Sequence, residues 1–292
     1  MTRSTLARAL TLTAGLLAGA FAHAQPVQTA EAVQVQQIRN ATVKITYAET
    51  TFLIDPMLAK KGAYPGFEGT YRSHLRNPLV DLPMPEQEVL NGVDAVIVTH
   101  THLDHWDDAA QQQLPKDLPL FVQNAADASH IRKQGFRDVR VLEGQTEFGG
   151  VTLSKTGGQH GTDTMYAVPP LAEMLGEAMG VVFQAPGHKT LYLAGDTIWR
   201  TEVERALEAY RPEVVVLNAG YARLDGFEGA IIMGKDDVLR ATQVAPQATV
   251  VAVHLDAINH MALSREALRA FVWQQGIETR VEIPEDGAAL AF

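Results

Sequence analysis

The sequence predicts a single α/β domain built from alternating strands and helices. Short apolar runs such as 93–98, 190–195 and 248–253 alternate with stretches of helical periodicity along the chain. No Ser/Gly-rich linker, charge run, internal repeat or low-complexity tract divides it. The chain has 46% hydrophobic residues and no cysteine, so an apolar core must stabilise it, and disulfides, thiolate ligands and cysteine nucleophiles are excluded.

The first 24 residues are predicted to be a cleavable signal peptide, which leaves residues 25–292 as the folded domain. Arg3 and Arg8 precede an apolar stretch over 9–21 that is short for a membrane span, and residues 22–24 (Ala-His-Ala) form a small-x-small cleavage site. We therefore expect a periplasmic or secreted protein that has no membrane anchor after cleavage. A retained N-terminal anchor is the alternative.

The domain is predicted to begin with three antiparallel strands. Residues 33–38, 42–47 and 51–54 are rich in β-branched and apolar side chains, and the third run ends at Asp55 and Pro56. Asp55 is a carboxylate at a strand end, and we interpret it as a structural residue that orients a neighbouring loop.

A long irregular segment, residues 57–88, follows these strands. Seven glycines and prolines interrupt it, and a loop of this length in a compact domain is usually functional or mobile. It also concentrates basic residues in an otherwise acidic chain. Our hypothesis is that the segment borders the functional site, where Arg72, His74 or Arg76 meets an anionic or polar group of a substrate. A solvated surface loop is the alternative.

The most informative motif directly follows the apolar run 93–98. Residues 99–107 read Thr-His-Thr-His-Leu-Asp-His-Trp-Asp, so three imidazoles and a carboxylate fall within six positions. Imidazole nitrogen and carboxylate oxygen together suit zinc and similar first-row divalent ions. The segment therefore predicts a metal site, with a polar loop of solvated histidines as the alternative.

The spacing within this motif predicts how its side chains point. If the chain stays extended beyond the strand, His100, His102 and Asp104 lie on one side. His105 then begins the turn into a helix over 106–113, which the following proline ends. Because Asp104 and His105 are adjacent and diverge, one short loop could serve two ions.

The His-x-His-x-Asp-His motif resembles the signature of the metallo-β-lactamase superfamily. The surrounding sequence is similar to its branch of UlaG-like hydrolases, which are related to L-ascorbate-6-phosphate lactonase. The resemblance implies a four-layer αββα sandwich with the metals at one edge of the two sheets. It also implies three further ligands in chain order, namely a histidine, an aspartate that ends a strand and a final histidine.

Three later strand ends carry residues of these types. His160 follows the run 151–155, Asp196 follows 190–195, and His254 follows 248–253. Sheet proteins tend to assemble sites from the carboxyl ends of several strands, so this recurrence supports a shared site. The resemblance implies one metal on His100, His102 and His160, a second on Asp104, His105 and His254, and Asp196 as the bridge.

Each of these later residues also has an alternative role. His160 could be an ordinary loop histidine between glycines. Asp196 could cap the helix expected to follow it, because Asp is a favoured N-cap residue. His260 competes with His254 as the final ligand. We favour His254 because it stands at a strand end, whereas His260 lies near the Ser264 cap of the last helix.

Other segments are expected to approach the metals. Residues 162–180 follow His160 directly and form a second candidate lid, whose apolar residues could equally pack against the sandwich. Tyr221 follows a strand-like run, and Lys235 stands at a predicted helix start, so both are candidate substrate contacts. His188 is expected in a hairpin turn, and either it or Tyr221 could stabilise a reaction intermediate if the fold brings it close.

Together with the resemblance, the ligand set predicts a metal-dependent hydrolase in which a metal-bridging hydroxide attacks the substrate. Two zinc ions per chain are expected, with manganese or iron as alternatives. Asp104 and Asp196 are the candidate catalytic carboxylates, because they would hold and orient the hydroxide. The chain contains no Gly-x-Ser-x-Gly motif and no cysteine that would offer a protein nucleophile.

The substrate is expected to be a small molecule, and the resemblance favours a lactone or another ester. Alternatives are hydrolysis of a phosphodiester or of an amide such as a β-lactam, oxidation by a mono-iron persulfide dioxygenase, and a non-catalytic metal- or ligand-binding role. The formal net charge of −10 argues against nucleic-acid binding. The sequence does not indicate an oligomeric state.

Overall fold

The computed structural model describes residues 1–2 and 32–292, so the predicted signal peptide lies almost entirely outside the described residues. The three strands expected at the start of the domain form half of the first sheet. They are β1 (Gln34–Arg39), β2 (Thr42–Tyr47) and β3 (Thr50–Ile54), paired antiparallel as predicted. The short strand β14 (Ala289–Ala291) pairs with the free edge of β1.

The other half of the first sheet is parallel. β4 (Ala95–Val98), β5 (Leu120–Val122) and β6 (Val139–Val141) continue from β3 in chain order. Because parallel neighbours need crossover connections, helices occupy the intervening segments. These helices are α1 (Glu86–Leu90), α2 (Asp108–Gln113) and α3 (Ala125–Lys133).

The second sheet repeats this pattern of antiparallel strands followed by parallel ones. Its antiparallel half comprises β7 (Gln145–Phe148), β8 (Val151–Thr156), β9 (Gly180–Gln184) and β10 (Leu191–Leu193). Its parallel half adds β11 (Val214–Asn218), β12 (Thr249–Val253) and β13 (Val281–Glu282). The helices α6 (Thr201–Tyr210), α7 (Lys235–Val244) and α8 (Arg265–Gln275) follow β10, β11 and β12.

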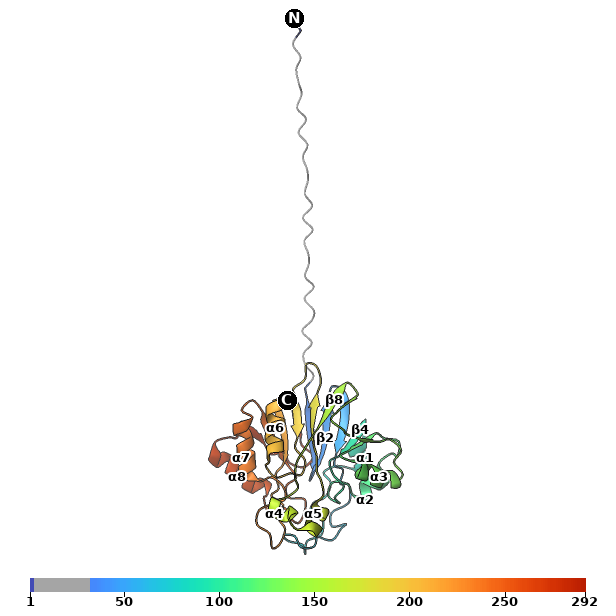
Figure 1. Cartoon of the computed structure of the whole chain (residues 1–292), viewed down its shortest axis with the longest axis vertical. Helices are drawn as coiled ribbons and strands as arrows, with labels where there is room; N and C mark the ends of the chain where they lie inside the picture. Colours follow the sequence, from blue (N-terminus) through green and yellow to red (C-terminus); the bar gives the residue numbers. More distant parts are fainter. Residues whose placement is uncertain (3–31) are drawn as a thin grey trace.

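The two seven-stranded sheets pack face to face, and helices cover their outer faces (Figure 1). Most strand residues are buried, because each sheet is covered by the other sheet on one face and by helices on the other. Their sequences therefore read as continuous apolar runs. Phe52 of the first sheet and Phe183 of the second meet edge to face in the central core, with ring centroids 5.4 Å apart. Separate apolar clusters lie beneath α1–α3 and beneath α6–α8. This is the αββα sandwich that the resemblance implies.

The helix starts show which local signals were correctly interpreted. α2 begins two residues later than predicted, because the Asp107 side chain accepts a hydrogen bond from the backbone N–H of Ala110 and caps the helix. Ser264 caps α8 as predicted. The idea that Asp196 caps a helix is wrong, because Arg200 occupies the N-cap of α6.

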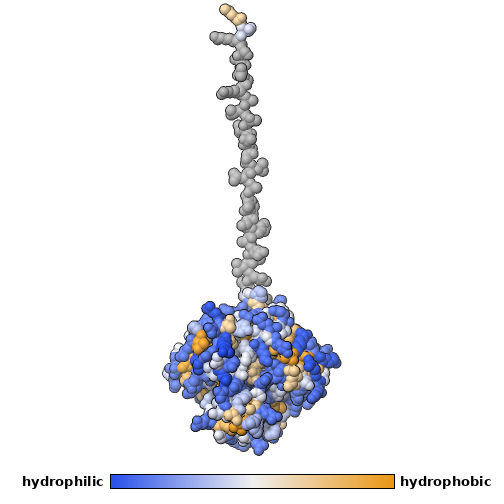
Figure 2. Space-filling model, viewed as in Figure 1, coloured by the Kyte–Doolittle hydropathy of each residue, from blue (hydrophilic) through white to orange (hydrophobic). Residues whose placement is uncertain are grey.

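Two short helices, α4 (Asp163–Tyr166) and α5 (Pro169–Leu175), cross one end of the sandwich, shown at the bottom of Figure 1. A fourth apolar cluster lies in this region, around Met57, Met165 and Leu175. In Figure 2 the surface is mainly hydrophilic, with some apolar residues at this lower end, and Met174 of α5 is 53% exposed. None of the helices within residues 32–292 is long and apolar enough to cross a bilayer.

Candidate metal centre

Several strands of both sheets have their C-terminal ends at the edge of the sandwich that α4 and α5 cross. Six of these strands carry a polar residue at or just beyond that end. This juxtaposition follows from the topology, because parallel strands in each sheet point the same way. The residues are Asp55 after β3, His100 after β4, His160 after β8, Asp196 after β10, Asn218 at the end of β11 and His254 after β12.

The structure brings the donor atoms of the seven predicted ligands together. Within each of three groups, one donor atom per residue lies within 4.8 Å of the others. The chain turns after His102, which accepts backbone hydrogen bonds from His105 and Trp106, so Asp104 faces a different group from His102. The groups are His100, His102 and His160; Asp104, His105 and His254; and His100, His105 and Asp196.

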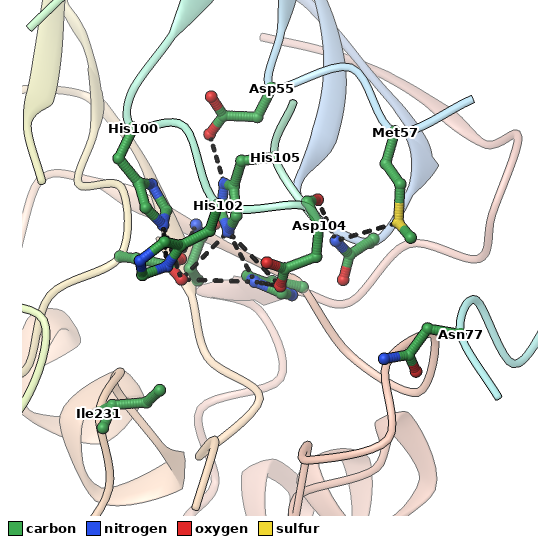
Figure 3. Close-up of polar contacts among 12 residues, drawn as sticks. Asp55, Met57, Asn77, His100, His102, Asp104, His105 and Ile231 are labelled. Atoms are coloured by element: carbon green, nitrogen blue, oxygen red, sulfur yellow. Dashed lines mark hydrogen bonds and ion pairs between the residues drawn. The ribbon is translucent and has the colours of Figure 1, made fainter. Parts of the chain in front are cut away.

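Asp196 lies between the first two of these three groups. Its Oδ2 is 3.1 Å from Nε2 of His105 and 3.6 Å from Nε2 of His254. The same oxygen is 3.8 Å from Nε2 of His160 and 4.0 Å from Nε2 of His100. One carboxylate oxygen therefore faces ligand atoms of both groups. Figure 3 shows the side chains of His100, His102, Asp104 and His105 turned toward one another.

The spacing and chemistry of these donors fit a divalent metal. Bonds of about 2.0–2.1 Å in a tetrahedral site place neighbouring donors roughly 3.3 Å apart. The observed donor separations include 3.0 Å between His100 Nε2 and His102 Nδ1, and 3.1 Å between the Nε2 atoms of His105 and His254. Several buried imidazoles whose nitrogens converge so closely are costly unless a cation joins them.

Hydrogen bonds to the outer nitrogens of three histidines determine which of their ring atoms faces the centre. His105 Nδ1 contacts Asp55 Oδ2 at 2.9 Å, and His160 Nδ1 donates to the Ile231 carbonyl at 3.0 Å. Both rings therefore present Nε2. His102 is reversed, because its Nε2 donates to the Met174 carbonyl at 2.9 Å and leaves Nδ1 facing the centre.

Asp55 occupies the position expected of an orienting residue. Its two oxygens accept hydrogen bonds from the backbone N–H and the hydroxyl of Thr99, each at 2.7 Å, while Oδ2 also contacts His105. Asp55 and His254 both have left-handed backbones, with φ of 44° and 60°. Such conformations are uncommon for non-glycine residues and cluster at functional sites.

The electrostatics of the cluster separate the histidines into two classes. Burial and the neighbouring imidazoles hold the pKa of His100 well below its usual value, and burial lowers the pKa of His160 to about 3. Burial opposes a charge on His105 too, but Asp196, Asp104 and Asp55 together raise its pKa well above the usual value. Without a metal, His105 is therefore protonated on both ring nitrogens and positively charged, while His100 and His160 are neutral.

Both carboxylates in the cluster remain ionised. Burial alone would raise the pKa of Asp196, yet His105 and His254 hold it well below the usual range. The pKa of Asp104 is also lowered, because His105, His254 and His260 outweigh its burial. Two buried anions therefore persist at neutral pH, as the ligation of a cation requires.

A cavity of about 260 Å³ opens beside this centre. The segment 57–88 and the segment 162–180 both border it, as the sequence predicted, and no lysine or arginine of the described chain lines it. Apolar atoms make up most of its exposed wall, and Glu68, Thr70 and His260 are the polar residues there besides the predicted ligands. The lining residues are Phe67, Glu68, Thr70, His102, Leu103, Asp104, His160, Met174, Leu175, Leu224, Ile231 and His260.

The basic residues predicted to contact substrate do not line this cavity. Arg72 donates to the carbonyls of Asn259 and Met261 at 3.1 and 2.7 Å, so its guanidinium joins two loops. Arg76 donates to backbone carbonyls within its own segment, and His74 is exposed. Irregular segments leave backbone carbonyls without hydrogen bonds from regular secondary structure. Arg76 donates to such carbonyls in its own segment, and Arg72 donates to those of the loop that contains Asn259.

The other two predicted substrate contacts, and His188 as a candidate to stabilise an intermediate, also lie elsewhere. Tyr221 is 40% exposed and packs against Gly234. Lys235 places Nζ 4.9 Å from the centroid of the Phe271 ring on α8. His188 lies in the β9–β10 turn, at the opposite end of those strands from Asp196, so it cannot stabilise an intermediate at this centre.

Two residues near the centre were not predicted from the sequence, and a third was given a different role. Asn218 donates to Asp196 Oδ1 at 2.6 Å, and it carried the same signal as the ligands, a polar residue at the end of an apolar run. Asn40 donates to the Asp104 carbonyl at 2.8 Å from a distant hairpin, which no local pattern reveals. His260 was considered only as a rival ligand, whereas it lines the cavity.

Comparison with known proteins adds a family and close structural relatives. A family model described as a beta-lactamase superfamily domain matches residues 50–255. The UPF0173 protein YddR of Bacillus subtilis is 46% identical over 261 residues, which cover 89% of this chain and all of that protein.

Two crystal structures match at similar levels. A possible metal-dependent hydrolase from Veillonella parvula shares 52% identity and a TM-score of 0.89, covering 89% of this chain and all of its own. An isothiocyanate hydrolase from Delia radicum gut bacteria shares 50% identity and a TM-score of 0.86, covering 89% of this chain and 99% of its own.

Proposed function

Because the chain belongs to the metallo-β-lactamase superfamily of metal-dependent hydrolases, we propose that it adds water to a small, uncharged electrophile with an apolar substituent. The observation that carries the proposal is the apolar cavity beside the metal centre. An apolar substituent is favourably desolvated in such a cavity. A phosphate or carboxylate on that substituent, away from the metals, would meet no lysine or arginine in the wall and would lie in the same cavity as Glu68, which is costly.

An isothiocyanate is the first candidate substrate. The support is the relative described as an isothiocyanate hydrolase, which this chain matches over nearly the whole of that protein at 50% identity. An isothiocyanate, R–N=C=S, is neutral, narrow and electrophilic at its central carbon. Addition of one water gives a thiocarbamic acid, which breaks down to the amine R–NH₂ and carbonyl sulfide. An alkyl or benzyl substituent suits a cavity of about 260 Å³.

A neutral lactone or other ester is the second candidate, and the apolar wall of the cavity admits it equally. The narrower resemblance to UlaG-like lactonases stays a prediction. Its phosphorylated substrate class is disfavoured, because the arginines that would have met a phosphate are bound to backbone carbonyls instead.

The ligands proposed for the metals are the two groups of three donors with Asp196 between them. We propose two zinc ions, since one group offers three imidazole nitrogens and the other offers two imidazole nitrogens and a carboxylate oxygen, all of which zinc accepts. Manganese or iron suits the same set. A divalent metal bound there would lower the pKa of water and polarise the electrophile.

The chain's own residues then orient the reactants. Asp196 and Asp104 are ionised, so they can accept hydrogen bonds from the attacking water and direct it toward the adjoining cavity. Asn218 holds the second oxygen of Asp196 and so fixes the plane of that carboxylate. Phe67, Met174 and Leu175 line the cavity with apolar surface, which disfavours bulk water beside the bound substrate.

The test is a substrate panel run on protein of measured metal content. It compares benzyl isothiocyanate, a neutral γ-lactone with a benzyl substituent and a phosphorylated sugar lactone, with His102→Ala as the control for metal-dependent turnover. We expect the two neutral substrates to be hydrolysed, the isothiocyanate with the higher kcat/KM. Turnover of the phosphorylated lactone alone, or equal rates for wild type and His102→Ala, would refute the proposal.

A further inference from the structure

We propose that His260, in the cavity wall, contacts the reacting group of the substrate and hydrogen-bonds the heteroatom next to the electrophilic carbon. The inference rests on the proposed function in taking a neutral electrophile as the occupant of the cavity. It adds a residue that contacts the substrate and is not a predicted metal ligand, since His260 lies outside the three groups of potential metal ligands.

The burial of His260 is the first observation that supports this role. The residue is 6% exposed, yet it lines the cavity beside Asp104 and His102. Its Nδ1 is buried without a hydrogen-bond partner in the described part of the chain. Being fully buried, Nδ1 does not open to the cavity. Nε2 also makes no hydrogen bond within the described residues and is not fully buried, so it is the ring nitrogen that can meet a ligand or a water.

The charge state of His260 suits contact with a neutral ligand. Burial lowers its pKa to about 4, although Asp104 acts in the opposite direction. The ring is therefore uncharged at neutral pH and offers one N–H donor and one acceptor nitrogen. A neutral N–H donor can stabilise the negative charge that develops on nitrogen, sulfur or oxygen during attack. Because it carries no positive charge itself, it does not attract anions to the cavity in the ground state.

The loop that carries His260 is held rigidly by its neighbour Asn259. The Asn259 backbone N–H donates to Asn77 Oδ1 at 2.8 Å, and its side-chain Nδ2 donates to Thr70 Oγ1 at 2.8 Å. Asn259 Oδ1 accepts from the backbone N–H of Phe67 at 3.0 Å. These bonds join the loop to the segment 57–88, which forms another part of the cavity wall.

The same network places an aromatic ring against the imidazole. The Phe67 ring centroid lies 5.2 Å from that of His260, with the ring planes inclined at 58°. The imidazole is thus held by backbone anchoring on one side and by ring packing on the other. A group fixed before the substrate arrives loses little entropy on binding, which is what a positioning residue requires.

The first test compares His260→Phe with His260→Gln. Phenylalanine preserves the ring packing on Phe67 but removes both nitrogens, whereas glutamine restores an amide donor and acceptor. For benzyl isothiocyanate we expect His260→Phe to lower kcat by about 100-fold, with KM changed less than about threefold, and His260→Gln to recover part of the loss. Metal content should equal that of wild type in both variants. His130→Phe, at an exposed position on α3, is the matched control.

The second test observes the imidazole directly. Zinc-loaded protein with ¹⁵N-labelled histidine is titrated with 2-phenylethyl azide, a linear and uncharged probe that resembles an isothiocyanate. We expect the ring nitrogens of His260 to shift on binding, and this signal to be absent from His260→Phe. The titration reports contact with a neutral ligand even if the wild type hydrolyses no isothiocyanate, so the two proposals fail separately.

Three results would overturn the role of His260. Unchanged ring signals at saturating azide would show that the ligand does not contact it, whatever the kinetics. Wild-type kcat in His260→Phe would show that the ring only packs against Phe67. Loss of metal from His260→Phe would show that the residue supports the metal centre instead.

Discussion

At the scale of single residues, the centre depends on side chains that never face the metals themselves. Asp55 is the clearest case, since it joins β3, the Thr99 backbone and the imidazole of His105. A carboxylate on the outer nitrogen of a ligating histidine fixes its ring and increases its basicity. The sequence located this residue as an orienting group because the ligand set was already complete without it.

Replacing Asp55 tests this role. Asp55→Asn keeps the size of the side chain but removes the charge that pairs with His105, so we expect metal affinity to fall by about 10–100-fold. The measurement is competition against a chelator of known affinity. Asp94→Asn is the control, because Asp94 accepts a backbone N–H on an exposed part of the same sheet. Equal affinities for the two variants would contradict the interpretation of Asp55.

The raised pKa of His105 predicts that metal binding releases a proton. Burial lowers this pKa, but Asp196, Asp104 and Asp55 outweigh it, so the metal-free protein holds the proton at neutral pH. A ligating imidazole must be deprotonated, and metal affinity should therefore rise with pH until His105 loses its proton in the metal-free state. Calorimetry in buffers of different ionisation enthalpy should show release of about one proton per chain.

The same shifts set the pH dependence of the metal-free protein's stability. The His105 contribution is complete below its unfolded pKa and is lost as the pH rises through the raised folded value. The Asp196 contribution has the opposite sign, since it is present above the unfolded pKa and is lost as the pH falls through the lowered folded value. A metal affinity that does not change between about pH 6 and 8 would contradict the raised pKa of His105, whereas Asp196 stays ionised throughout that range.

At the scale of elements, the loops after β11 and β12 must pass very close to each other. A Cβ atom added to Gly220 would lie 2.2 Å from the carbonyl oxygen of His254 and 2.3 Å from Met261 Sδ. The first of these is backbone, which cannot rotate away. Glycine at this position therefore allows the His254 loop to reach the centre.

Gly220→Ala is expected to move His254 and to weaken the centre. We expect a loss of about 1–3 kcal/mol in the free energy of unfolding, together with a measurable fall in bound metal per chain. Thermal unfolding and elemental analysis provide the two measurements. Gly157→Ala is the matched control, because its new Cβ would meet only the flexible Glu202 side chain at 3.2 Å. If both variants behave alike, the close approach at His254 has no functional role.

At the scale of the whole molecule, the two sheets have the same strand pattern and share one core. Each runs from antiparallel to parallel strands, and the apolar cluster between them draws residues from both. Neither sheet could keep its inner face buried without the other. We therefore predict that residues 25–292 unfold as one cooperative unit.

Tryptophan fluorescence can test this cooperativity in each half separately. Trp106 packs in the cluster beneath α1–α3, and Trp199 packs against the cluster beneath α6–α8. Two variants are needed, one with Trp106 and one with Trp199 as its only tryptophan, and Trp273 is replaced in both. Their urea transitions should coincide. Phe183→Ala, which removes a ring from the shared core, should lower the free energy of unfolding by about 3–5 kcal/mol as reported by both probes. Separate midpoints would indicate two domains.

Export remains a prediction at this scale. If residues 1–24 are a signal peptide, mass spectrometry of protein recovered from the periplasm or medium should find Gln25 as the first residue. The basic n-region is the part of the signal that can be tested, so replacing Arg3 and Arg8 by glutamate should leave the precursor in the cell. Recovery of uncleaved, membrane-bound protein would favour the alternative of a retained anchor.

The sequence by itself determined the sandwich, through its superfamily motif, and the residue types of the predicted metal centre. These could be read because their signals are local: imidazoles two positions apart in one loop, and single polar residues at the ends of apolar runs. Strand ends in parallel sheets meet at one edge, so a one-dimensional pattern specifies a shared location. The predicted donors therefore lie together without any further adjustment of the assignment.

Only the tertiary structure decided which groups surround the bound substrate. Arg72 and His260 are both polar residues in irregular segments, and nothing local distinguishes a guanidinium that binds backbone carbonyls from an imidazole in a cavity wall. Their roles depend on contacts between segments nearly 190 positions apart, such as those of Asn259 with Thr70. A cavity is formed by packing of distant elements, so its lining follows from three-dimensional complementarity and not from any pattern along the chain.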